Sequence, residues 1–280
     1  MGIFMKVLGI KSKKLINIDR FITFIHRKEN GAFYFSGESH DFWEFVYVKE
    51  GNVGITADDK IYSLKKGDMI IHKPMEFHAI YSEDSKGFDA YIFSFSAFGD
   101  GLKKLERKRA VLTDDKVNLI ENVISYGNKA FLSDKGNLIS INDELNYNLY
   151  LNTLEIFLLS IYNCKEFKEI TDSDTLMFSK IIKYLGDNIY GKIKVDDVAK
   201  SLYISTSKLK KLFHKYTGMG VLAYFNKLKI NKAKKLLQEG KSVGEVAKEL
   251  SYSSSFYFSK LFKEETKLLA SDFKKSQMLN

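Results

Sequence analysis

The segment VGEVAKELSYSSSFYFSKLFKEET (residues 243–266) decides the fold of the last third of the chain. The earlier segment VDDVAKSLYISTSKLKKLFHKYT (residues 195–217) repeats it, with one residue fewer in the turn. In the first half of each copy, apolar residues recur at positions i, i+3, i+4 and i+7, which predicts an amphipathic helix. A serine-rich turn and a second helical pattern follow. Each copy is therefore predicted to fold as a helix, a tight turn and a second helix.

Residue types at the predicted helix starts support this interpretation. Ser242 and Glu245 have the spacing of a capping box, in which each side chain bonds the other residue's backbone. Asp196 and Asp197 fall in the first turn of the earlier copy, where the helix dipole favours negative charge. A small alanine stands where the two helices of each copy cross. This is the plan of a helix-turn-helix unit, whose second helix lies in the major groove of DNA.

The second helix of the later copy has an unusual outward face. Helical phase turns Phe258, Leu261 and Phe262 towards the core and places a phenylalanine and two lysines together on the opposite side. Lysine donates to guanine O6 and N7, and an apolar ring packs on a thymine methyl. The alternative is a helical hairpin with a solvated lysine face. The predicted DNA contacts are Ser207, Lys208, Lys210, Lys211, His214 and Lys215 in the first copy and Ser255, Phe256, Ser259, Lys260 and Lys263 in the second.

Charge is distributed unevenly along the chain. Residues 1–174 contain 23 basic and 26 acidic residues, whereas residues 175–280 contain 21 basic and 9 acidic ones. The excess of positive charge thus lies in the part that holds the repeat. A charged run is usually a solvated face, but an asymmetry of this size favours a polyanionic partner. The predicted partner is double-stranded DNA, which each monomer reads in two major-groove boxes roughly 34 Å apart.

Residues 176–280 resemble the DNA-binding domain of AraC/XylS-type transcriptional regulators. The resemblance runs through VAKSLYISTSKLKKLFHKYTGMG, the connecting segment YFNKLKINKAKKLLQEGKSVGEVA and SYSSSFYFSKLFKEET. It implies a sequence-specific DNA-binding regulator. The chain departs from the family pattern at Ser251 and Lys267, where glycine is usual, and at Ala270, where proline is usual. Arginines that are common in the family are replaced here by Lys211, Lys229 and Lys260, and a lysine offers a point charge instead of a bidentate fork.

The N-terminal part reads as β structure. The stretch FWEFVYVKEGNVGITADDKIYSLKKGDMIIHKP (residues 42–74) has short runs rich in Val, Ile, Tyr and Phe, separated by turn signals. Strands this short and closely spaced predict a barrel or sandwich. From about residue 102 to 165 the pattern is helical, and NDELNYNLYLNTLEIFLLSIYN (residues 142–163) has a broad apolar face.

That face is larger than one small barrel needs to cover it, so we expect a two-fold homodimer through residues 143–162, with a contribution from residues 115–126. The fold class predicted is therefore a multidomain α+β chain with an all-α C-terminal domain. Its expected parts are a cupin-like sensor barrel (1–98), a helical dimerisation segment (99–164), a linker (165–175) and a tandem helix-turn-helix domain (176–280).

The segments HDFWEFVYVKEG and GDMIIHKPMEFH are similar to the two cupin motifs, and cupin-like barrels are the usual sensor domains of the AraC/XylS family. In metal-binding cupins two histidines, a glutamate and a later histidine hold the metal. His40, Glu44 and His78 match that set, but Glu38 stands at the first histidine position. The resemblance implies that such sensor barrels generally hold no metal, so we expect neither a metal nor a cofactor.

A small-molecule site in the barrel is the alternative use of these residues. The predicted ligand-binding residues are His40, Trp43, Glu44 and His78, although Trp43 could equally pack between barrel and helices. The remaining histidines, His26, His72 and His214, are expected to be surface or internally bonded residues, with His214 also on the DNA-facing side.

The composition of the chain indicates the cellular compartment in which the protein is expected. Cys164 is the one cysteine, so no disulfide forms within the chain, which fits a reducing compartment. No stretch reaches the roughly 20 apolar residues of a membrane span. The first residues lack the basic, apolar and small-residue order of a signal peptide. We expect a cytoplasmic protein without a membrane partner.

Together these features predict a DNA-binding transcriptional regulator, not an enzyme, that is controlled by a small-molecule effector and for which RNA polymerase is a further partner. Two other functions stay open. One is a metal-dependent cupin enzyme fused to a DNA-binding tail, and the other is an architectural DNA binder with a vestigial barrel.

Overall fold

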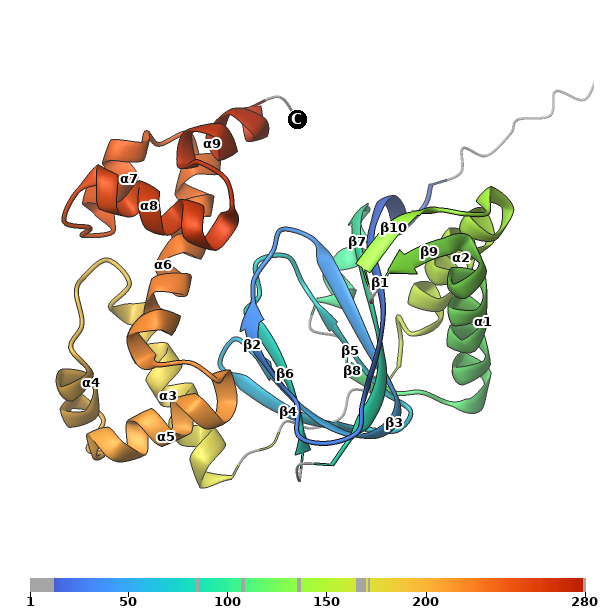
Figure 1. Cartoon of the computed structure of the whole chain (residues 1–280), viewed down its shortest axis with the longest axis horizontal. Helices are drawn as coiled ribbons and strands as arrows, with labels where there is room; N and C mark the ends of the chain where they lie inside the picture. The colour runs from blue at the N-terminus through green and yellow to red at the C-terminus, as the bar shows by residue number, and fades with distance from the viewer. Residues whose placement is uncertain are drawn as a thin grey trace, which may run out of the picture.

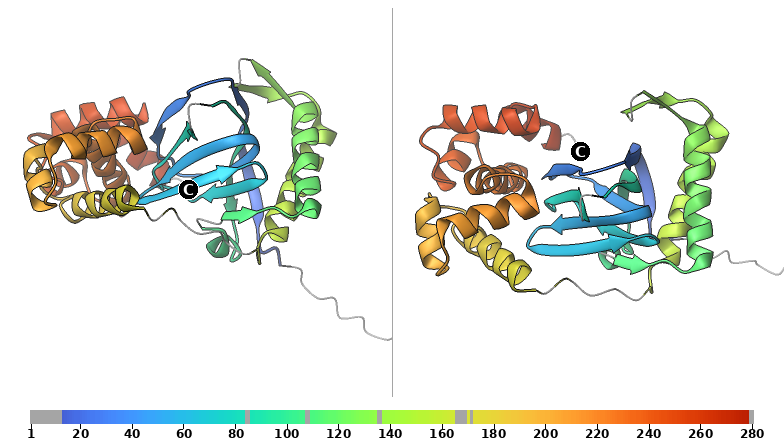
Figure 2. Two further views of the ribbon diagram at one scale, coloured as in Figure 1. Left: turned by 90° about the horizontal axis from the view of Figure 1, so that it is seen from below. Right: turned by 60° about the horizontal axis from the view of Figure 1, so that its bottom comes forward.

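The computed structural model describes residues 13–83, 86–106, 109–134, 137–164, 170 and 172–278. An antiparallel sheet lies at the centre, two helices cover it on one side, and the C-terminal helices lie on the other side (Figure 1). The two further views in Figure 2 show the same order of parts. None of the helices within the described residues is both long enough and apolar enough to cross a membrane.

The strands are β1 (Asn17–Glu29), β2 (Tyr34–Glu38), β3 (Trp43–Ala57), β4 (Lys60–Lys65), β5 (Asp68–His72), β6 (His78–Ser82), β7 (Phe88–Phe98), β8 (Arg109–Val111), β9 (Phe131–Asp134) and β10 (Asn137–Ile141). The helices are a short 3-10 turn η2 (Leu102–Leu105), α1 (Asp114–Ala130), α2 (Glu144–Ser160), α3 (Ser173–Asp187), α4 (Val195–Ser201), α5 (Thr206–Thr217), α6 (Val221–Gln238), α7 (Val243–Glu249), α8 (Ser255–Thr266) and α9 (Ala270–Met278).

Strand β3 joins the two halves of the sheet. Its first half pairs with β5 and β7, and its second half pairs with β4 and β6, while β2 pairs with β6. The change of partner occurs at Gly51, which has a φ of 82°. Only glycine adopts this conformation readily, and a Cβ there would lie 2.6 Å from the carbonyl oxygen of Gly87. Glycine therefore allows the bend that closes the sheet around an interior.

Apolar residues fill two spaces around the sheet. One cluster, including Val48, Val53 and Ile80, lies inside it. The other lies between the sheet and helices α1 and α2, where the ring of Phe45 meets that of Phe157 at 5.3 Å between centroids. Trp43 belongs to this second cluster and is buried. The helices thus cover one face of the sheet with aromatic contacts.

The C-terminal region contains the two predicted helix-turn-helix units, α4–α5 and α7–α8, joined by α6. Phe258 and Phe262, which were predicted to face inward, are buried, and Leu261 is partly so. The corresponding helix of the first copy buries Leu209, Leu212, Phe213 and Tyr216. The capping box of Ser242 and Glu245 is present at the start of α7. Hydrophobic periodicity therefore predicted these helices and their phase correctly.

Other segments differ from the prediction. Strand β8 and the β9–β10 hairpin lie within residues 99–164, which were expected to be helical; β8 adds to the sheet by pairing with β5. Helix α3 begins inside the expected linker because Asp172 caps it, accepting from the backbone N–H groups of Asp174 and Thr175. Residues 1–12, 165–169 and 171 lie outside the described residues. The division of the chain at residues 98, 164 and 175 stays a prediction.

Candidate DNA interface and histidine cluster

Helices α5 and α8 begin with the same capping arrangement. The side chains of Ser205 and Ser254 accept hydrogen bonds from the backbone N–H groups of Lys208 and Tyr257. Their first turns read TSK and SFY and contain no acidic residue, although Thr206 at the start of α5 donates to the carboxylate of Asp196 at 2.9 Å. Such helix ends attract phosphate groups. Helix α8 therefore presents an electropositive start, and both helices present a lysine-bearing side.

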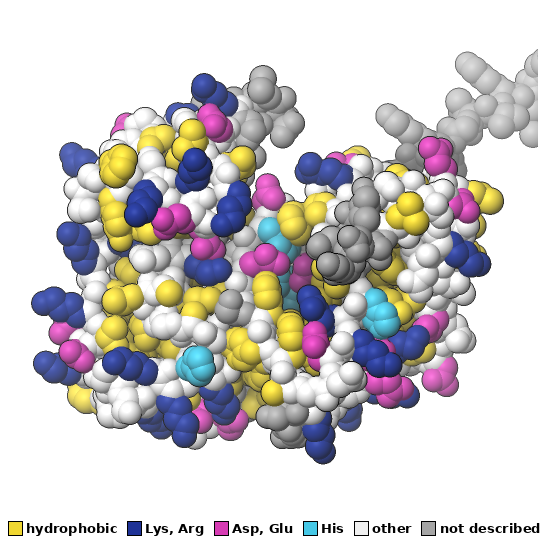
Figure 3. Space-filling view, viewed as in Figure 1, with side chains coloured by type: hydrophobic (Ala, Val, Ile, Leu, Met, Phe, Trp, Pro, Cys, Tyr) yellow, Lys and Arg dark blue, Asp and Glu magenta, His cyan; other side chains and the backbone are white. Residues whose placement is uncertain are grey.

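The outward side of α8 is as predicted. Phe256 is 82% exposed, which is rare for a large apolar side chain, and Lys260 and Lys263 are exposed beside it. In α5 the predicted contact residues are likewise all exposed, and on α8 only Ser259 is half-buried. Lysine side chains are spread over the helical region in Figure 3. The structure thus confirms the exposure of these residues, whereas their contacts with DNA stay a prediction.

Several of these lysines have acidic neighbours. Lys208 and Lys215 lie 4.0 Å and 3.7 Å from the carboxylate of Asp174, and Lys260 lies 3.9 Å from Glu264. All of these side chains are about half exposed, and ion pairs of this kind contribute little to stability. Such pairs leave the lysines available to a polyanion.

A buried lysine joins the two helix-turn-helix units. Lys229 of α6 donates hydrogen bonds to the carbonyl oxygen of Gly191 (2.5 Å), in the loop that precedes α4, and to that of Leu250 (2.7 Å), at the end of α7. Its ammonium also lies 5.0 Å and 5.2 Å from the ring centroids of Phe225 and Tyr252. Burial, and then the nearby Lys192, lowers the pKa of Lys229. The family resemblance indicated this position, but its role as a link depends on the tertiary structure.

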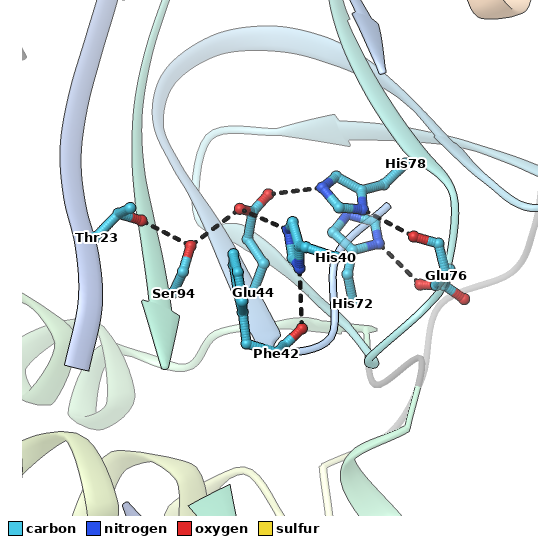
Figure 4. Close-up of polar contacts among 8 residues, drawn as sticks. All are labelled: Thr23, His40, Phe42, Glu44, His72, Glu76, His78 and Ser94. Carbon is cyan, nitrogen blue, oxygen red and sulfur yellow. Dashed lines mark hydrogen bonds and ion pairs between the residues drawn. The ribbon is translucent and has the colours of Figure 1, made fainter. Parts of the chain in front are cut away.

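The second candidate site is a cluster around Glu44 of β3 (Figure 4). One carboxylate oxygen lies 3.2 Å from Nε2 of His78, and the other lies 3.5 Å from Nε2 of His40. The second oxygen also accepts a hydrogen bond from the Ser94 hydroxyl (3.0 Å), which in turn accepts one from Thr23 (2.7 Å). Glu44 is therefore held in place from β1 and β7 while it faces two imidazoles.

Both imidazoles are oriented by backbone carbonyl groups. Nδ1 of His40 lies 3.1 Å from the carbonyl oxygen of Phe42, and Nδ1 of His78 lies 3.1 Å from that of Glu76. A carbonyl oxygen only accepts, so each Nδ1 carries a hydrogen and donates it. Each Nε2 is thereby turned towards Glu44.

A third histidine, His72, packs against the cluster. His72 and Glu76 form a fully buried pair with 2.9 Å between Nδ1 and the carboxylate, and the ring of His72 stacks on that of His78 at 4.6 Å. Glu38, at the end of β2, pairs in register with His78. Ligand atoms of Glu38, His40, Glu44 and His78 all lie within 4.8 Å of one another.

The cluster shifts the protonation of its members. Burial disfavours a charged Glu44, but His78 and His40 outweigh it and hold the pKa of Glu44 well below its ordinary value. Burial also disfavours a charged His78, yet the charge and contact of Glu44, with a smaller effect of Glu38, raise the pKa of His78 to about 9. Burial and then the neighbouring His78 lower the pKa of His72. Without another ligand, Glu44 and His78 thus form a buried ion pair.

A cavity of about 130 Å³ lies inside the sheet beside this cluster. Its polar wall consists of Arg27, Glu38, Glu44, His72 and His78. The rest of the lining is apolar and comes mainly from Phe33, Phe35, Val46, Ile55, Ile80 and Ile92. An apolar pocket with a few convergent polar groups is the usual form of a small-ligand site.

The segments that carry the cluster also contact the C-terminal region. Phe77, between Glu76 and His78 in the chain, packs its ring against that of Tyr224 in α6, with centroids 4.8 Å apart. Lys227 of α6 donates to the carbonyl oxygen of Gly37 at 3.0 Å. Histidine and acidic side chains meet at this boundary between the two regions (Figure 3).

Comparison with known proteins follows this division of the structure. Residues 23–106 match the AraC-like ligand binding domain family, and residues 198–276 match a helix-turn-helix domain family. Together the two matches cover more than half of the chain. The chain belongs to the AraC family of transcriptional regulators.

Relatives of this AraC-family regulator match across both parts. The uncharacterized HTH-type transcriptional regulator YfiF of Bacillus subtilis is 25% identical over 238 residues, which is 80% of this chain and 73% of YfiF. The Msm operon regulatory protein of Streptococcus mutans is 26% identical over 239 residues, 82% of each chain. Among solved structures, ToxT of Vibrio cholerae O395 is 15% identical, with a TM-score of 0.38 over 94% of this chain and 98% of ToxT.

The AraC-family regulator departs from the predicted ligand site at two residues. Glu44 and His78 line the cavity, whereas His40 lines a separate hollow with Lys234 and Glu265. Trp43 packs in the cluster between sheet and helices and does not line the cavity. Successive side chains of a strand point to opposite faces of the sheet, so Trp43 lies on the face opposite Glu44. Sequence reasoning placed Glu38 outside the site and treated His72 as an ordinary histidine, and it missed Glu76 and Ser94. The pairing of β2 with β6, which sets the position of Glu38, has no local sequence signal.

Proposed function

We propose that this AraC-family regulator reads DNA through α5 and α8 and that a small molecule in the sheet cavity controls this binding. The main support for the proposal is that residues 76–78 contact both the histidine cluster and the DNA-binding region. Glu76 and His78 point into the histidine cluster, whereas Phe77 between them is buried against Tyr224. A ligand that moves His78 also moves Phe77, because the three residues are consecutive.

Gly37 extends this contact. A Cβ at Gly37 would lie 2.4 Å from the ring of Phe77, so the two residues touch, and Gly37 has a φ of 77°. The carbonyl oxygen of Gly37 accepts from Lys227, and that of Ser39 lies 3.4 Å from Nζ of Lys234. Movement on the cavity side of segments 37–40 and 76–78 would therefore reach α6, which connects the two units that read DNA.

For DNA recognition we propose two major-groove boxes per monomer, about one helical turn apart. In this arrangement α5 and α8 enter successive grooves on one face of the duplex. Ser207, Lys210 and Lys211 would read one box, and Phe256, Ser259 and Lys260 the other. The other lysines, Lys208, Lys215 and Lys263, are placed for phosphates.

We further propose a two-fold homodimer through α2, with a contribution from residues 115–126 of α1. Its apolar residues divide between two faces: Leu154, Phe157 and Leu158 are buried against the sheet, while another set is exposed. The exposed set consists of Leu145, Leu149, Ile156 and Leu159. With Asn152 they follow the alternating spacing of four and three residues that is typical of a coiled-coil seam. RNA polymerase stays a proposed partner, as expected for a regulator.

We infer that the cavity serves sensing and not catalysis. The alternative of a cupin enzyme requires access of a substrate to the cluster and its turnover there. The contacts of Phe77 and Gly37 with α6 and with Lys227 instead connect the cluster to the DNA-binding part. An architectural DNA binder, the other alternative, would show no change in DNA affinity with any small molecule.

The proposal is tested with the full chain and a duplex selected from a random library. A thermal-shift screen of metabolites identifies a ligand, because binding to the folded state raises the melting temperature. Fluorescence anisotropy then measures DNA affinity with and without that ligand. We expect a change of at least about fivefold in the Kd for DNA, which is a typical coupling between two sites.

The variant Phe77→Ala is expected to bind the ligand but to lose most of this change. Phe98→Ala is the matched control, because Phe98 is an exposed residue at the end of β7. A ligand effect on DNA affinity that persists unchanged in Phe77→Ala, or the absence of any such effect in the unaltered protein, would rule out the proposed route.

A further inference from the structure

We propose that Glu38, His40, Glu44 and His78 form a binding site for one divalent transition-metal ion at the polar wall of the cavity. The inference names a ligand for the cavity, and in that respect it rests on the proposed function. The sequence predicted no metal because the sensor barrels that it resembles generally hold none, and because Glu38 stands where metal-binding cupins have a histidine. In the structure, the Glu38 carboxylate lies in the same group as the ligand atoms of the other three residues. Glu38 can therefore take the place of the missing histidine as a metal ligand.

The distances fit a single ion. The four ligand atoms lie within 4.8 Å of one another. A metal with bonds of about 2.1 Å to nitrogen and oxygen holds its ligand atoms roughly 3–4 Å apart. Small rotations of the side chains therefore bring all four onto one ion. Glu38 is exposed at the end of β2, so its carboxylate is free to make the largest of these movements.

The orientation of the two imidazoles is that of metal ligands. Each Nδ1 donates to a backbone carbonyl group, of Phe42 for His40 and of Glu76 for His78. Among the described residues, each Nε2 is buried and has no hydrogen-bond partner of good geometry, and each lies within 3.5 Å of the Glu44 carboxylate. A hydrogen bond from the far nitrogen to a carbonyl group is the usual support of a metal-bound histidine.

Glu44 has the corresponding support. Ser94 donates to one of its oxygens at 3.0 Å, and Thr23 donates to Ser94 at 2.7 Å, so two strands fix the carboxylate. The same oxygens face the two imidazoles. An ion between them would replace a contact of 3.2 Å and one of 3.5 Å with direct bonds.

The ligand types select a class of metal. Two imidazole nitrogens with two carboxylate oxygens suit Zn(II), Mn(II), Fe(II) or Co(II). Mg(II) and Ca(II) prefer sets made only of oxygen, and soft ions such as Cu(I) prefer sulfur. A divalent ion would also balance the charges of Glu38 and Glu44.

The test uses the full chain without an affinity tag, treated with EDTA and then dialysed. Zn(II), Mn(II) and Co(II) are added separately, the protein is passed over a desalting column, and the bound metal is measured by elemental analysis. We expect one equivalent of at least one metal, a rise in melting temperature, and an absorbance band of bound Co(II).

Two variants test whether His40 and Glu38 are ligands of the bound metal. His40→Ala and Glu38→Gln are expected to weaken metal binding by on the order of tenfold or more. Glu38→Gln keeps the test valid if His40→Ala does not fold, because Glu38 is exposed and a glutamine preserves its shape. His26→Gln is the control, since His26 lies outside the group and pairs with Asp89. Less than about a tenth of an equivalent of every metal, or binding unchanged in both variants, would overturn the inference.

A separate measurement distinguishes this inference from the proposed function. DNA affinity is determined with the EDTA-treated chain and with the metal-loaded chain. Stoichiometric metal with unchanged DNA affinity would support the site and contradict metal control of DNA binding. No metal, with an organic ligand that alters DNA affinity, would overturn the site and leave the proposed function standing.

Discussion

Lys267 and Gly218 end the equivalent helices α8 and α5 in the same left-handed backbone conformation, with φ of 63° and 62°. Only glycine adopts this conformation without strain. The difference between the copies lies in what surrounds them. A Cβ at Gly218 would lie 2.1 Å from the ring of Tyr34 in β2, whereas Lys267 is exposed. The second copy therefore accepts a side chain at a modest strain, and the first excludes one.

We predict that Lys267→Gly stabilises the protein by about 1 kcal/mol, because it removes the strain of the left-handed conformation. Urea unfolding followed by circular dichroism measures the change. Lys263→Gly, in the body of the same helix, serves as the comparison and is expected to destabilise by about 1 kcal/mol. Equal losses of stability in both variants would contradict the account.

The histidine cluster predicts how stability depends on pH in the metal-free chain. The pKa of His78 is raised to about 9, so its contribution is complete below its unfolded value near 6.5 and is lost as pH rises through 9. The pKa of Glu44 is lowered, so its contribution is lost as pH falls below about 4.5. His72, whose pKa is lowered, opposes His78 only near and below pH 6.5.

The free energy of unfolding is thus expected to fall by up to about 3 kcal/mol between pH 6.5 and 9.5. Urea titrations with EDTA at several pH values measure this slope. His78→Gln should remove most of the slope, whereas His26→Gln should keep it. The same slope in His78→Gln would show that another group is responsible.

Helices of the C-terminal region were predictable because their signal is local. The phase of α8, with Phe258 and Phe262 inside and Phe256 outside, follows from spacing within a dozen residues. Strand β8 has three residues and no period to detect, and the β9–β10 hairpin is almost as short. The membership of Glu38 in the cluster depends on pairing between β2 and β6, which are far apart in the sequence. The local pattern therefore predicted the exposed face of α8 correctly but only part of the cavity wall.

The outward face of α8 is predicted to separate base reading from phosphate binding. We predict that Lys260→Ala weakens binding to the selected duplex by about 1–3 kcal/mol and relaxes preference at one base pair. Phe256→Ala is expected to weaken binding mainly where a thymine methyl is present. Lys263→Ala should weaken all sequences alike and lower the salt slope by about one unit.

Fluorescence titrations against selected and scrambled duplexes at several salt concentrations compare the three variants. Circular dichroism provides the folding control, and all three are expected to keep their helical signal because the side chains are exposed. Indistinguishable profiles for Lys260→Ala and Lys263→Ala would mean that this face does not read bases.

Helix α2 makes a prediction about assembly. The double variant Leu145→Glu and Ile156→Glu places two charges in the exposed apolar seam and is expected to convert a dimer into a monomer. Sedimentation equilibrium at micromolar concentration measures the mass. Leu268→Glu, a similarly exposed leucine in the C-terminal region, is expected to leave the mass unchanged. A monomeric unaltered chain would contradict the proposed dimer.

In the whole molecule, the sheet domain and the DNA-binding helices share one apolar cluster. Ile61, Phe77 and Ala79 of the sheet lie in it with Phe213 and Tyr224 of the helical region. Thr56 also donates to the backbone carbonyl of Tyr216 across the boundary. This contact involves the α4–α5 unit, so we expect a change in the cavity to act on that unit as well as on α6. The α7–α8 unit would follow through α6.

We expect Lys229 to determine how closely the second unit follows the first. Its two hydrogen bonds, to Gly191 and Leu250, tie both units to α6 and oppose their independent movement. One inserted base pair moves the second box by about 3.4 Å and turns it by about 35° around the duplex axis. A regulator with fixed units therefore measures the distance between boxes as well as their sequence. We expect one added base pair to weaken binding at least tenfold and Lys229→Met to reduce this penalty, so tolerance of spacing would report on the stiffness of a single buried side chain.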